Sequence, residues 1–340
     1  MVTGLKSRIL PDVQRRTLEE LTEDLDLSSG DTRSKKSAFW TMLVLSGVIA
    51  TAGVLSDSTA TVIGAMIIAP LATPIMGIAL GVAKTTPGAA GRSGRFVLGG
   101  AAIVVLTGAL FSLGLPESFD LLGNSQISGR TSPGILDLIA AIATGFAGAV
   151  AMARRDVAAV LPGVAIAISL VPPLAVVGVC LGQGAVALAL GALLLFVSNL
   201  LALVLAGSLV FAVLGYGAED GEASTPALSR RKAYLTIGVL LVVIGVPLVG
   251  NTVGAYLVSE WTARTQSAAE QWVSAVQGAS ISGVDFQSST LYIEVQTPDD
   301  IPPVDDLLAD LDGQIPNGIP VVVTTTLGQR IEAGTVGTTR

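Results

Sequence analysis

The sequence contains no histidine and a single cysteine, Cys180, so two large classes of chemistry have no residues to build on. Without histidine there is no Ser-His-Asp triad, no His-ligated zinc centre and no imidazole that titrates near neutral pH. One cysteine cannot form an intrachain disulfide. Neither a glycine-rich phosphate loop nor a nucleophile paired with a base is present. We therefore expect a protein that is not an enzyme and that needs no cofactor and no metal.

Charged and aromatic residues are also scarce, at 13% and 4%, whereas hydrophobic residues make up 51% of the 340 residues. The mean hydropathy is +0.71. This composition predicts an α-helical, multi-pass integral membrane protein, with the lipid bilayer as its first partner. The 39 glycines suit helices whose backbones approach closely in lipid.

The two ends of the chain differ from this apolar middle. Residues 1–37 are polar and lack the apolar core of a cleavable signal, and Thr17 and Glu20 have the spacing of a capping box at the start of a short amphipathic helix. From Glu260 onward eleven acidic residues face three arginines, which does not favour binding to nucleic acid. The acid-rich run 299–312 lacks the ligand order of an EF-hand, and we interpret it as a solvated helix face.

Seven hydrophobic segments lie between these ends, each long or nearly long enough to cross a bilayer of about 30 Å. They span residues 38–55, 60–83, 96–115, 134–153, 157–181, 185–214 and 234–258. Prolines fall inside two of them, and proline removes a backbone donor and blocks the preceding helical turn. The second and fifth segments should therefore break near mid-membrane, at Pro70, Pro74, Pro162, Pro172 and Pro173.

The two broken segments share a motif at a constant separation of 99 residues. In each, an aspartate, a glycine and a proline recur in register, at Asp57, Gly64 and Pro74 and again at Asp156, Gly163 and Pro173. Segments one to three (38–115) thus match segments four to six (134–214). Because three is odd, the second copy enters from the opposite side, which predicts an inverted repeat. Chance similarity between Ala/Val/Gly/Leu-rich helices is the alternative.

Positive charges mark alternate loops. Basic residues precede segment one and follow segments two, four and six, whereas the other loops carry only Arg130. By the positive-inside rule the N-terminus is cytoplasmic and residues 259–340 lie outside the plasma membrane, the inner membrane of a bacterium. This last region predicts a small αββαβ domain, with helices at 260–276 and 304–311 and strands at 281–286, 291–295 and 321–325.

The stretch Gly64-Ala-Met-Ile-Ile-Ala-Pro-Leu-Ala-Thr-Pro-Ile-Met-Gly77 and the paired Val171-Pro-Pro-Leu174 carry a resemblance to a known family. The chain resembles, over residues 38–215, the "uncharacterised hydrophobic domain" family of bacterial and archaeal membrane proteins, a domain of unknown function. The resemblance implies an integral membrane protein. It implies no activity, substrate or cofactor.

The breaks supply the candidate site for a solute or ion. Unwound backbone near Pro74, Pro172 and Pro173 would expose carbonyls to a cation, and half-helix N-termini would attract an anion. Hydroxyls of Thr73 and Ser169 and the amide of Asn199 lie in the same segments. Proline kinks healed by neighbouring helices are the alternative at the breaks. For Asn199 the alternative is an interhelical hydrogen bond.

Two acids complete the candidate set. Asp57 and Asp156 begin the broken segments, and an ionisable group at membrane depth is a functional candidate. Helix capping is the alternative for both, and Asp156 can also pair with Arg154 or Arg155. The Gly77–Gly81 and Gly178–Gly182 pairs have the spacing of close helix contacts.

These features favour a transporter-like protein that moves a small solute or ion through a site at the broken helices. A membrane-anchored sensor or scaffold, whose external domain binds a ligand, lipid or partner, is the second hypothesis. An ion channel is the third. Small-residue helix faces also predict a homo-oligomer.

Overall fold

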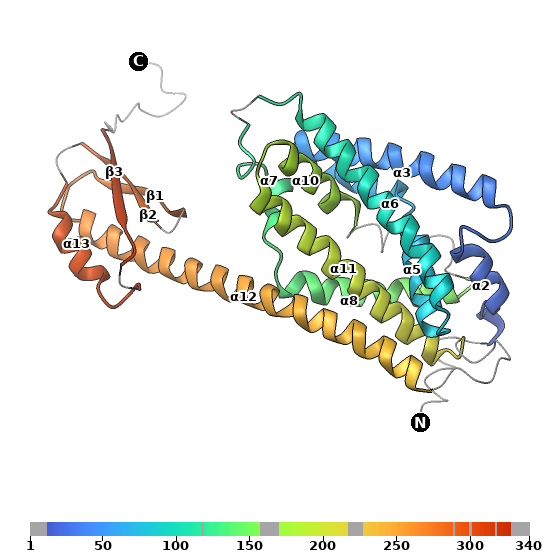
Figure 1. The fold of residues 1–340 in the computed structure, drawn as a ribbon. Helices are drawn as coiled ribbons and strands as arrows, with labels where there is room; N and C mark the ends of the chain where they lie inside the picture. The colour runs from blue at the N-terminus through green and yellow to red at the C-terminus, as the bar shows by residue number, and fades with distance from the viewer. Residues whose placement is uncertain are drawn as a thin grey trace, which may run out of the picture. The chain divides into compact units, whose positions relative to one another are not determined.

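The structure is a computed structural model that describes residues 12–116, 119–156, 170–216, 227–287, 290–298, 301–316 and 318–327 (Figure 1). The chain divides into two compact units, Met1–Asn251 and Thr252–Arg340. The first unit is helical and the second holds a small sheet, so the composition change near residue 259 marks a real change in architecture.

The first unit begins with a short 3₁₀ helix, η1 (Asp12–Gln14), and an amphipathic helix, α2 (Leu18–Leu25). The predicted capping box is present, because Thr17 Oγ1 accepts from Glu20 N at 3.2 Å and Glu20 Oε2 accepts from Thr17 N at 2.8 Å. Leu21 and Leu25 are buried, so the apolar face of α2 packs against the rest of this unit.

Four helices in the described part of the chain are apolar and long enough to cross a membrane: α3 (Thr32–Leu55), α6 (Pro87–Ser112), α8 (Ile135–Ala153) and α11 (Val186–Val213). A fifth crossing is added if α4 (Thr59–Ile68) and α5 (Ala72–Ala83), which meet at a bend of 53°, form one span. The protein is therefore membrane-embedded.

The remaining predicted segments are not established as spans. Residues 157–169, with Pro162, Gly163 and Ser169, lie outside the described residues, and the rest of the fifth segment forms the shorter apolar helix α10 (Val171–Gly182). The seventh lies within α12 (Ala227–Val273). The count of seven and the inverted repeat thus remain predictions.

The hydrophobic pattern predicted one helix start wrongly and did not reveal one helix. α6 begins at Pro87, in its first turn, rather than near residue 96. Proline fits the first turn because its missing N–H has no helical acceptor there, and the polar residues that follow are still helical. The overlooked helix is α7 (Ser125–Thr131), capped by Asn124, whose side chain accepts from Gln126 N and Ile127 N.

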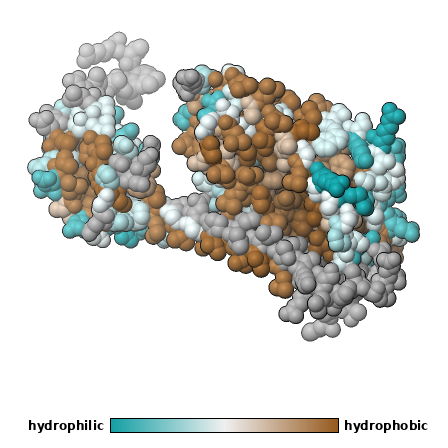
Figure 2. Space-filling view, in the orientation of Figure 1, coloured by the Kyte–Doolittle hydropathy of each residue, from teal (hydrophilic) through white to brown (hydrophobic). Residues whose placement is uncertain are grey.

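Most basic residues of the first unit gather at one end of the helices, which we call the basic end. Here Lys35 Nζ, near the start of α3, donates to Glu23 O at 2.6 Å, and Arg92, near the start of α6, pairs with Asp26 at 3.1 Å. The ends of α8 and α11 are also here, because Ala153 O accepts from Arg16 N and the Tyr216 hydroxyl donates to Arg16 O. In Figure 2 hydrophilic residues cluster at this end, beside a broad hydrophobic surface.

At the opposite end, which we call the α7 end, amide side chains connect the helices. Asn124 Nδ2 donates to Val54 O at the end of α3, and Gln126 Nε2 donates to Thr59 Oγ1 at the start of α4. Gln183 Nε2, just after α10, donates to Ser112 O at the end of α6. Consequently α3 and α6 run from the basic end to the α7 end, whereas α8 and α11 run back.

The second unit has its own hydrophobic core. Strand β2 (Thr290–Thr297) lies between β1 (Ser280–Gln287), its antiparallel neighbour, and β3 (Val321–Leu327), its parallel one. The end of α12 and helix α13 (Val304–Leu311) pack on one face of this sheet through buried residues that include Ala269, Trp272, Leu291, Ile293, Val295 and Leu307. Helix α13 and the three strands lie where the sequence predicted them, whereas the predicted helix at 260–276 is the end of α12, which is continuous with the seventh hydrophobic segment.

Candidate functional site

Two short helices, α5 and α10, form the buried centre of the first unit. Every residue of α10 from Val171 to Cys180 is buried, and nine of the twelve residues of α5 are buried. Long helices therefore cover these short ones on all sides, since a helix facing lipid would keep one exposed apolar face. The bounds of α5 and α10 are 99 residues apart at both ends.

The two helices also end in the same way. After α5, Lys84 N donates to Leu80 O and Thr86 N to Gly81 O; 99 residues later, Gln183 N donates to Val179 O and Ala185 N to Cys180 O. A residue of positive φ sits in each turn, Thr85 at 56° and Gly184 at 73°. The ends of α5 and α10 therefore have the same backbone hydrogen-bond pattern at a separation of 99 residues.

The packing around the two helices is reciprocal. A Cβ on Gly108 of α6 would lie 2.5 Å from Ala175 O and 3.0 Å from the Cα of Gly178, both on α10. A Cβ on Gly207 of α11 would lie 2.9 Å from the Ala79 Cβ and 3.0 Å from the Met76 Sδ, both on α5. Gly207 follows Gly108 by 99 positions, and Met76 and Ala79 precede Ala175 and Gly178 by the same 99, so the two contacts involve corresponding positions.

Both short helices start inside the unit. α5 runs toward the basic end and α10 toward the α7 end, and twelve residues rise about 18 Å, so each start lies deep between the two ends. Pro74 lies in the first turn of α5, and Pro172 and Pro173 in that of α10, where a missing N–H costs least. Neither helix has a side-chain cap, and proline removes one N–H from the first turn of α5 and two from that of α10.

A neighbouring helix donates a hydrogen bond to the chain just before the break that precedes α5. Ser46, buried on α3, donates its hydroxyl to Ala65 O at 2.9 Å, and this carbonyl also accepts from Ala69 N. Pro70 has no N–H, so the Met66 carbonyl loses its helical donor. Thr73 is half-buried in the first turn that follows the break. The break thus offers carbonyls on its α4 side and N–H groups on its α5 side.

Asn199 places an amide at mid-depth. It lies at the middle of α11 and is 4% exposed. Its counterpart 99 residues earlier is Gly100 of α6, where a Cβ would contact the side chain of Leu71, the residue at the start of α5. Asn199 therefore corresponds to a position on α6 that lies beside the start of α5.

Asp57 lies away from these helix starts, at the α7 end. It is exposed, has a φ of 50°, and accepts from Ser125 Oγ at 2.7 Å and Gln126 N at 3.1 Å. The hydrogen bond from the Ser125 hydroxyl holds the pKa of this carboxyl below its usual range. The cap of α4 is Ser58, not Asp57, so Asp57 instead fastens α7 to the turn between α3 and α4.

Asp156 lies at the opposite, basic end. Its two carboxylate oxygens accept from Arg154 Nε at 2.9 Å and Arg154 Nη2 at 2.6 Å, and this ion pair raises the pKa of the guanidinium. The structure thus brings together Thr73, Pro74 and the start of α5 but separates the two acids from each other and from the helix starts. Ser169 lies outside the described residues.

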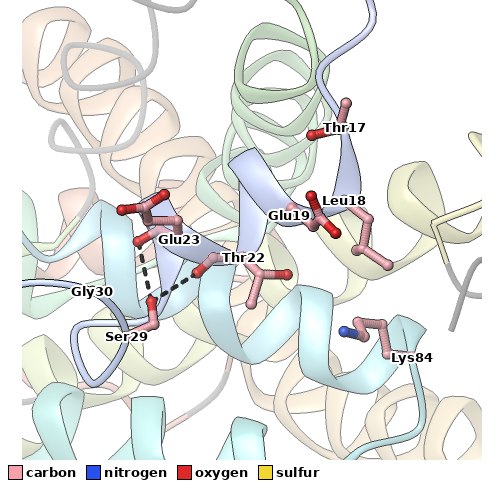
Figure 3. Close-up of a pocket in the computed structure, with 8 residues that line it drawn as sticks. All are labelled: Thr17, Leu18, Glu19, Thr22, Glu23, Ser29, Gly30 and Lys84. Atoms are coloured by element: carbon pink, nitrogen blue, oxygen red, sulfur yellow. Dashed lines mark hydrogen bonds between the residues drawn. The ribbon is translucent and has the colours of Figure 1, made fainter.

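A groove of about 880 Å³ lies at the basic end, between α2 and the end of α5 (Figure 3). It was not predicted from the sequence. Lys84 lines one side, and Thr17, Leu18, Glu19, Thr22, Glu23, Ser29 and Gly30 line the other. Thr22 Oγ1 is buried there without a hydrogen-bond partner. The amphipathic pattern of α2 was the available signal, because its apolar face required a partner.

Comparison with known proteins supports the resemblance seen in the sequence. Residues 66–205 match the model of a family described as Domain of unknown function (DUF389). The chain is also similar to an uncharacterized protein of Methanocaldococcus jannaschii, with 31% identity over 195 residues, which cover 57% of this chain and 60% of that protein. No solved structure matches the chain. The matched range runs from the end of α4 into α11 and so contains both short central helices.

Proposed function

We propose that this protein moves a small solute or ion across the membrane by alternating access, through a site between the starts of α5 and α10. The reciprocal packing of Gly108 on α10 and of Gly207 on α5 carries this proposal. It supports a two-fold relation between oppositely directed copies, the architecture in which transporters bind substrate at interrupted helices near mid-membrane. The two halves would rock about these glycine contacts.

The distribution of charge supports a topology for this transporter. By the positive-inside rule, the basic residues at one end support a cytoplasmic location for that end and for the N-terminus. With the seven crossings predicted from the sequence, the second unit would lie outside the plasma membrane. Homo-oligomer formation also belongs to this proposal.

The proposed site consists of Thr73 and Pro74 at the start of α5, Pro172 and Pro173 at the start of α10, and Asn199. Unpaired carbonyls before α5 suit a cation and helix N-termini suit an anion, so the site can hold either charge at adjacent positions. Asp57 and Asp156 have structural partners at opposite ends. Their role in this mechanism is to hold the loops that must move.

Ligand-induced stabilisation tests the proposal across several candidate solutes at once. Purified protein is heated with Na⁺, K⁺, Ca²⁺, common anions or buffers of different pH, because a ligand that binds only the folded state raises its stability. Thr73→Val and Asn199→Leu should abolish a specific response. Thr107→Val is the matched control, since Thr107 is a half-buried threonine whose hydroxyl donates to Ile103 O within α6. An equal response in all variants would disprove the site.

The second unit favours a sensor or scaffold as the second candidate function. Its helices cover one face of the sheet, whereas Tyr292 and Val322, neighbours on β2 and β3, are 37% and 41% exposed on the other. An apolar pair on an open sheet face suits a ligand or a partner. A flat response in every thermal condition, with binding retained by the second unit, would favour this function over transport.

A further inference from the structure

The N-terminal segment 12–31, which we call the strap, contacts both copies of the repeat at the basic end. It comprises η1, α2 and the turn that leads into α3. It belongs to neither copy, since the repeated motif begins only after α3. A segment outside the repeat that touches both halves at one end is placed to control their relative motion.

The strap is bound to the second copy by backbone and ionic contacts. Arg16 N donates to Ala153 O at 3.0 Å and Arg155 N donates to Gln14 O at 2.9 Å, which forms an antiparallel bridge. The Arg155 guanidinium also donates to both carboxylate oxygens of Glu20 at 3.0 Å. The hydrogen bond from Thr17 N and the Arg155 side chain lower the pKa of Glu20, so this partner stays charged.

A buried tyrosine adds a second attachment to the same copy. Tyr216 follows α11, is fully buried, and donates its hydroxyl to Arg16 O at 2.8 Å. The Arg15 guanidinium lies 4.7 Å from the centre of the Tyr216 ring, within the range of a cation–π contact. The strap thus contacts the ends of both α8 and α11.

The strap contacts the first copy just as closely. Asp26 pairs with Arg92 of α6 at 3.1 Å, and Leu25 O lies where a Cβ on Gly77 of α5 would approach it to 2.8 Å. Only a glycine at position 77 lets the strap backbone lie this near. Leu21 and Leu25 are buried between α2 and the rest of the first unit.

These attachments are of a kind that can be released. The Glu20 and Arg155 side chains are 43% and 45% exposed, and ion pairs of this exposure are weak. The groove of Figure 3 separates part of α2 from the end of α5, and the buried Thr22 hydroxyl facing it has no hydrogen-bond partner. The strap is therefore held by buried side chains, a short backbone bridge and exposed charges, of which the exposed charges are the weakest attachment.

We propose that the strap is an ionic lock that holds the two halves together at the basic end, and that its release opens this end to the interior. The lock depends on the proposed function in one respect only: it requires the rocking motion of the two halves that it would restrain. Its contacts, between Glu20 and Arg155 and between Leu25 and Gly77, can be broken separately.

Thiol accessibility in the full-length protein tests the lock. Cys180 is first replaced by alanine, and Thr73→Cys places one thiol at the start of α5. A membrane-impermeant maleimide is added to vesicles of each orientation, so that it reaches the basic end in one preparation and the α7 end in the other. Glu20→Gln should raise the labelling rate from the basic end about two- to fivefold, the shift that an exposed ion pair supports.

Three further variants separate the lock from general loosening. Exchange of the charges, Glu20→Arg with Arg155→Glu, should restore slow labelling. Gly77→Ala should raise the rate with all charges intact, because its Cβ displaces the strap; it is made together with Ser93→Ala, since the Ser93 hydroxyl of α6 would otherwise lie 2.7 Å from the same Cβ. Glu19→Gln, a neighbouring exposed carboxylate of α2, is the matched control and should change nothing.

Unchanged labelling in both Glu20→Gln and Gly77→Ala would overturn the lock, and so would an equal rise from the α7 end. A disulfide between Arg15→Cys and Arg154→Cys, at the antiparallel bridge, should suppress basic-end labelling; labelling that persists would also overturn it. Responsive labelling without any ligand stabilisation would retain the lock and reject transport. Ligand stabilisation without any change in the labelling rate would support transport and overturn the lock.

Discussion

Gly108 on α6 and Gly178 on α10 pack so closely that a Cβ on either residue would lie within 3.0 Å of the Cα of the other. In a membrane, helices gain little from burying apolar surface away from water, so close backbone contact is a main source of association. The contact fixes α10 against the long helix α6. The arrangement of the centre therefore depends on the absence of two side chains.

Gly178→Ala should destabilise the first unit, because the new Cβ would lie 2.2 Å from Val105 O, a backbone atom that cannot rotate away. Overpacking of this kind costs about 1–3 kcal/mol. Gly64→Ala on α4 is the matched control, since no atom lies within 4 Å of its Cβ position. Alanine is a better helix former than glycine by about 1 kcal/mol, so the control should be neutral or stabilising.

Denaturant unfolding of both variants in the same detergent measures these differences. A Gly178→Ala protein as stable as the parent would show that α6 and α10 can separate without cost. That result would also remove the main support for a rigid glycine contact between these two helices.

The turns after α5 and α10 offer a second prediction from matched positions. Thr85 and Gly184 both have positive φ, and this conformation is strained for a β-branched residue but not for glycine. Gly184→Thr should therefore cost about 1–2 kcal/mol, because no neighbouring atom lies near its Cβ position and only the backbone is affected. Thr85→Gly should be neutral or stabilising.

Unfolding midpoints of these two variants check the prediction. Equal destabilisation by both substitutions would mean that the Thr85 hydroxyl, which donates to Lys84 O at 2.7 Å, outweighs backbone strain. The two turns would then differ in energetics despite their common hydrogen bonds.

Apolar helices and their breaks were predictable from sequence because each rests on local chemistry. Hydrophobic length located α3, α8 and α11, Pro70 located the bend, and the Thr17–Glu20 spacing located α2. Periodicity likewise located α13 at Val304–Leu311.

The partners of individual side chains were not predictable, because they come from distant parts of the chain. Asp57 had the position of a helix cap, yet its hydrogen bonds go to α7, a seven-residue helix with no hydrophobic periodicity to reveal it. Likewise the polar pattern of residues 12–31 gave no sign that Leu25 O would lie against Gly77. Asp57 was therefore identified, but not its hydrogen-bond partners in the fold.

Asp57 provides a test of pH dependence. Because its folded pKa is lowered, its charge stabilises the fold above the ordinary carboxyl pKa of 3.8, and this contribution is lost as the pH falls through the folded value. Asp57→Asn should thus lower the Tm at neutral pH, and the gap from the parent should close in acid, below about pH 4.

Thermal unfolding of parent and variant between neutral pH and pH 3 measures this gap. Glu19→Gln serves as the control, because Glu19 is an exposed carboxylate at the other end of the unit. A gap that stays constant down to acid pH would show that the Asn variant loses geometry and not charge.

The second unit should fold by itself as residues 259–340, because the last turns of α12, α13 and the sheet enclose one core.

Ile293 and Tyr292 are adjacent on β2 and point to opposite faces, with 0% and 37% exposure. Ile293→Ala should cost about 2–5 kcal/mol because it leaves a cavity in that core. Tyr292→Ala should cost about 1 kcal/mol or less, since its face is open to solvent. Urea unfolding followed by the fluorescence of Trp261 and Trp272 reports on both variants, since Trp261 contacts Phe286 and Trp272 Nε1 donates to Pro303 O at 3.0 Å. Equal losses would mean that the open face of the sheet is covered in the folded unit, which would also weaken the case for a partner surface there.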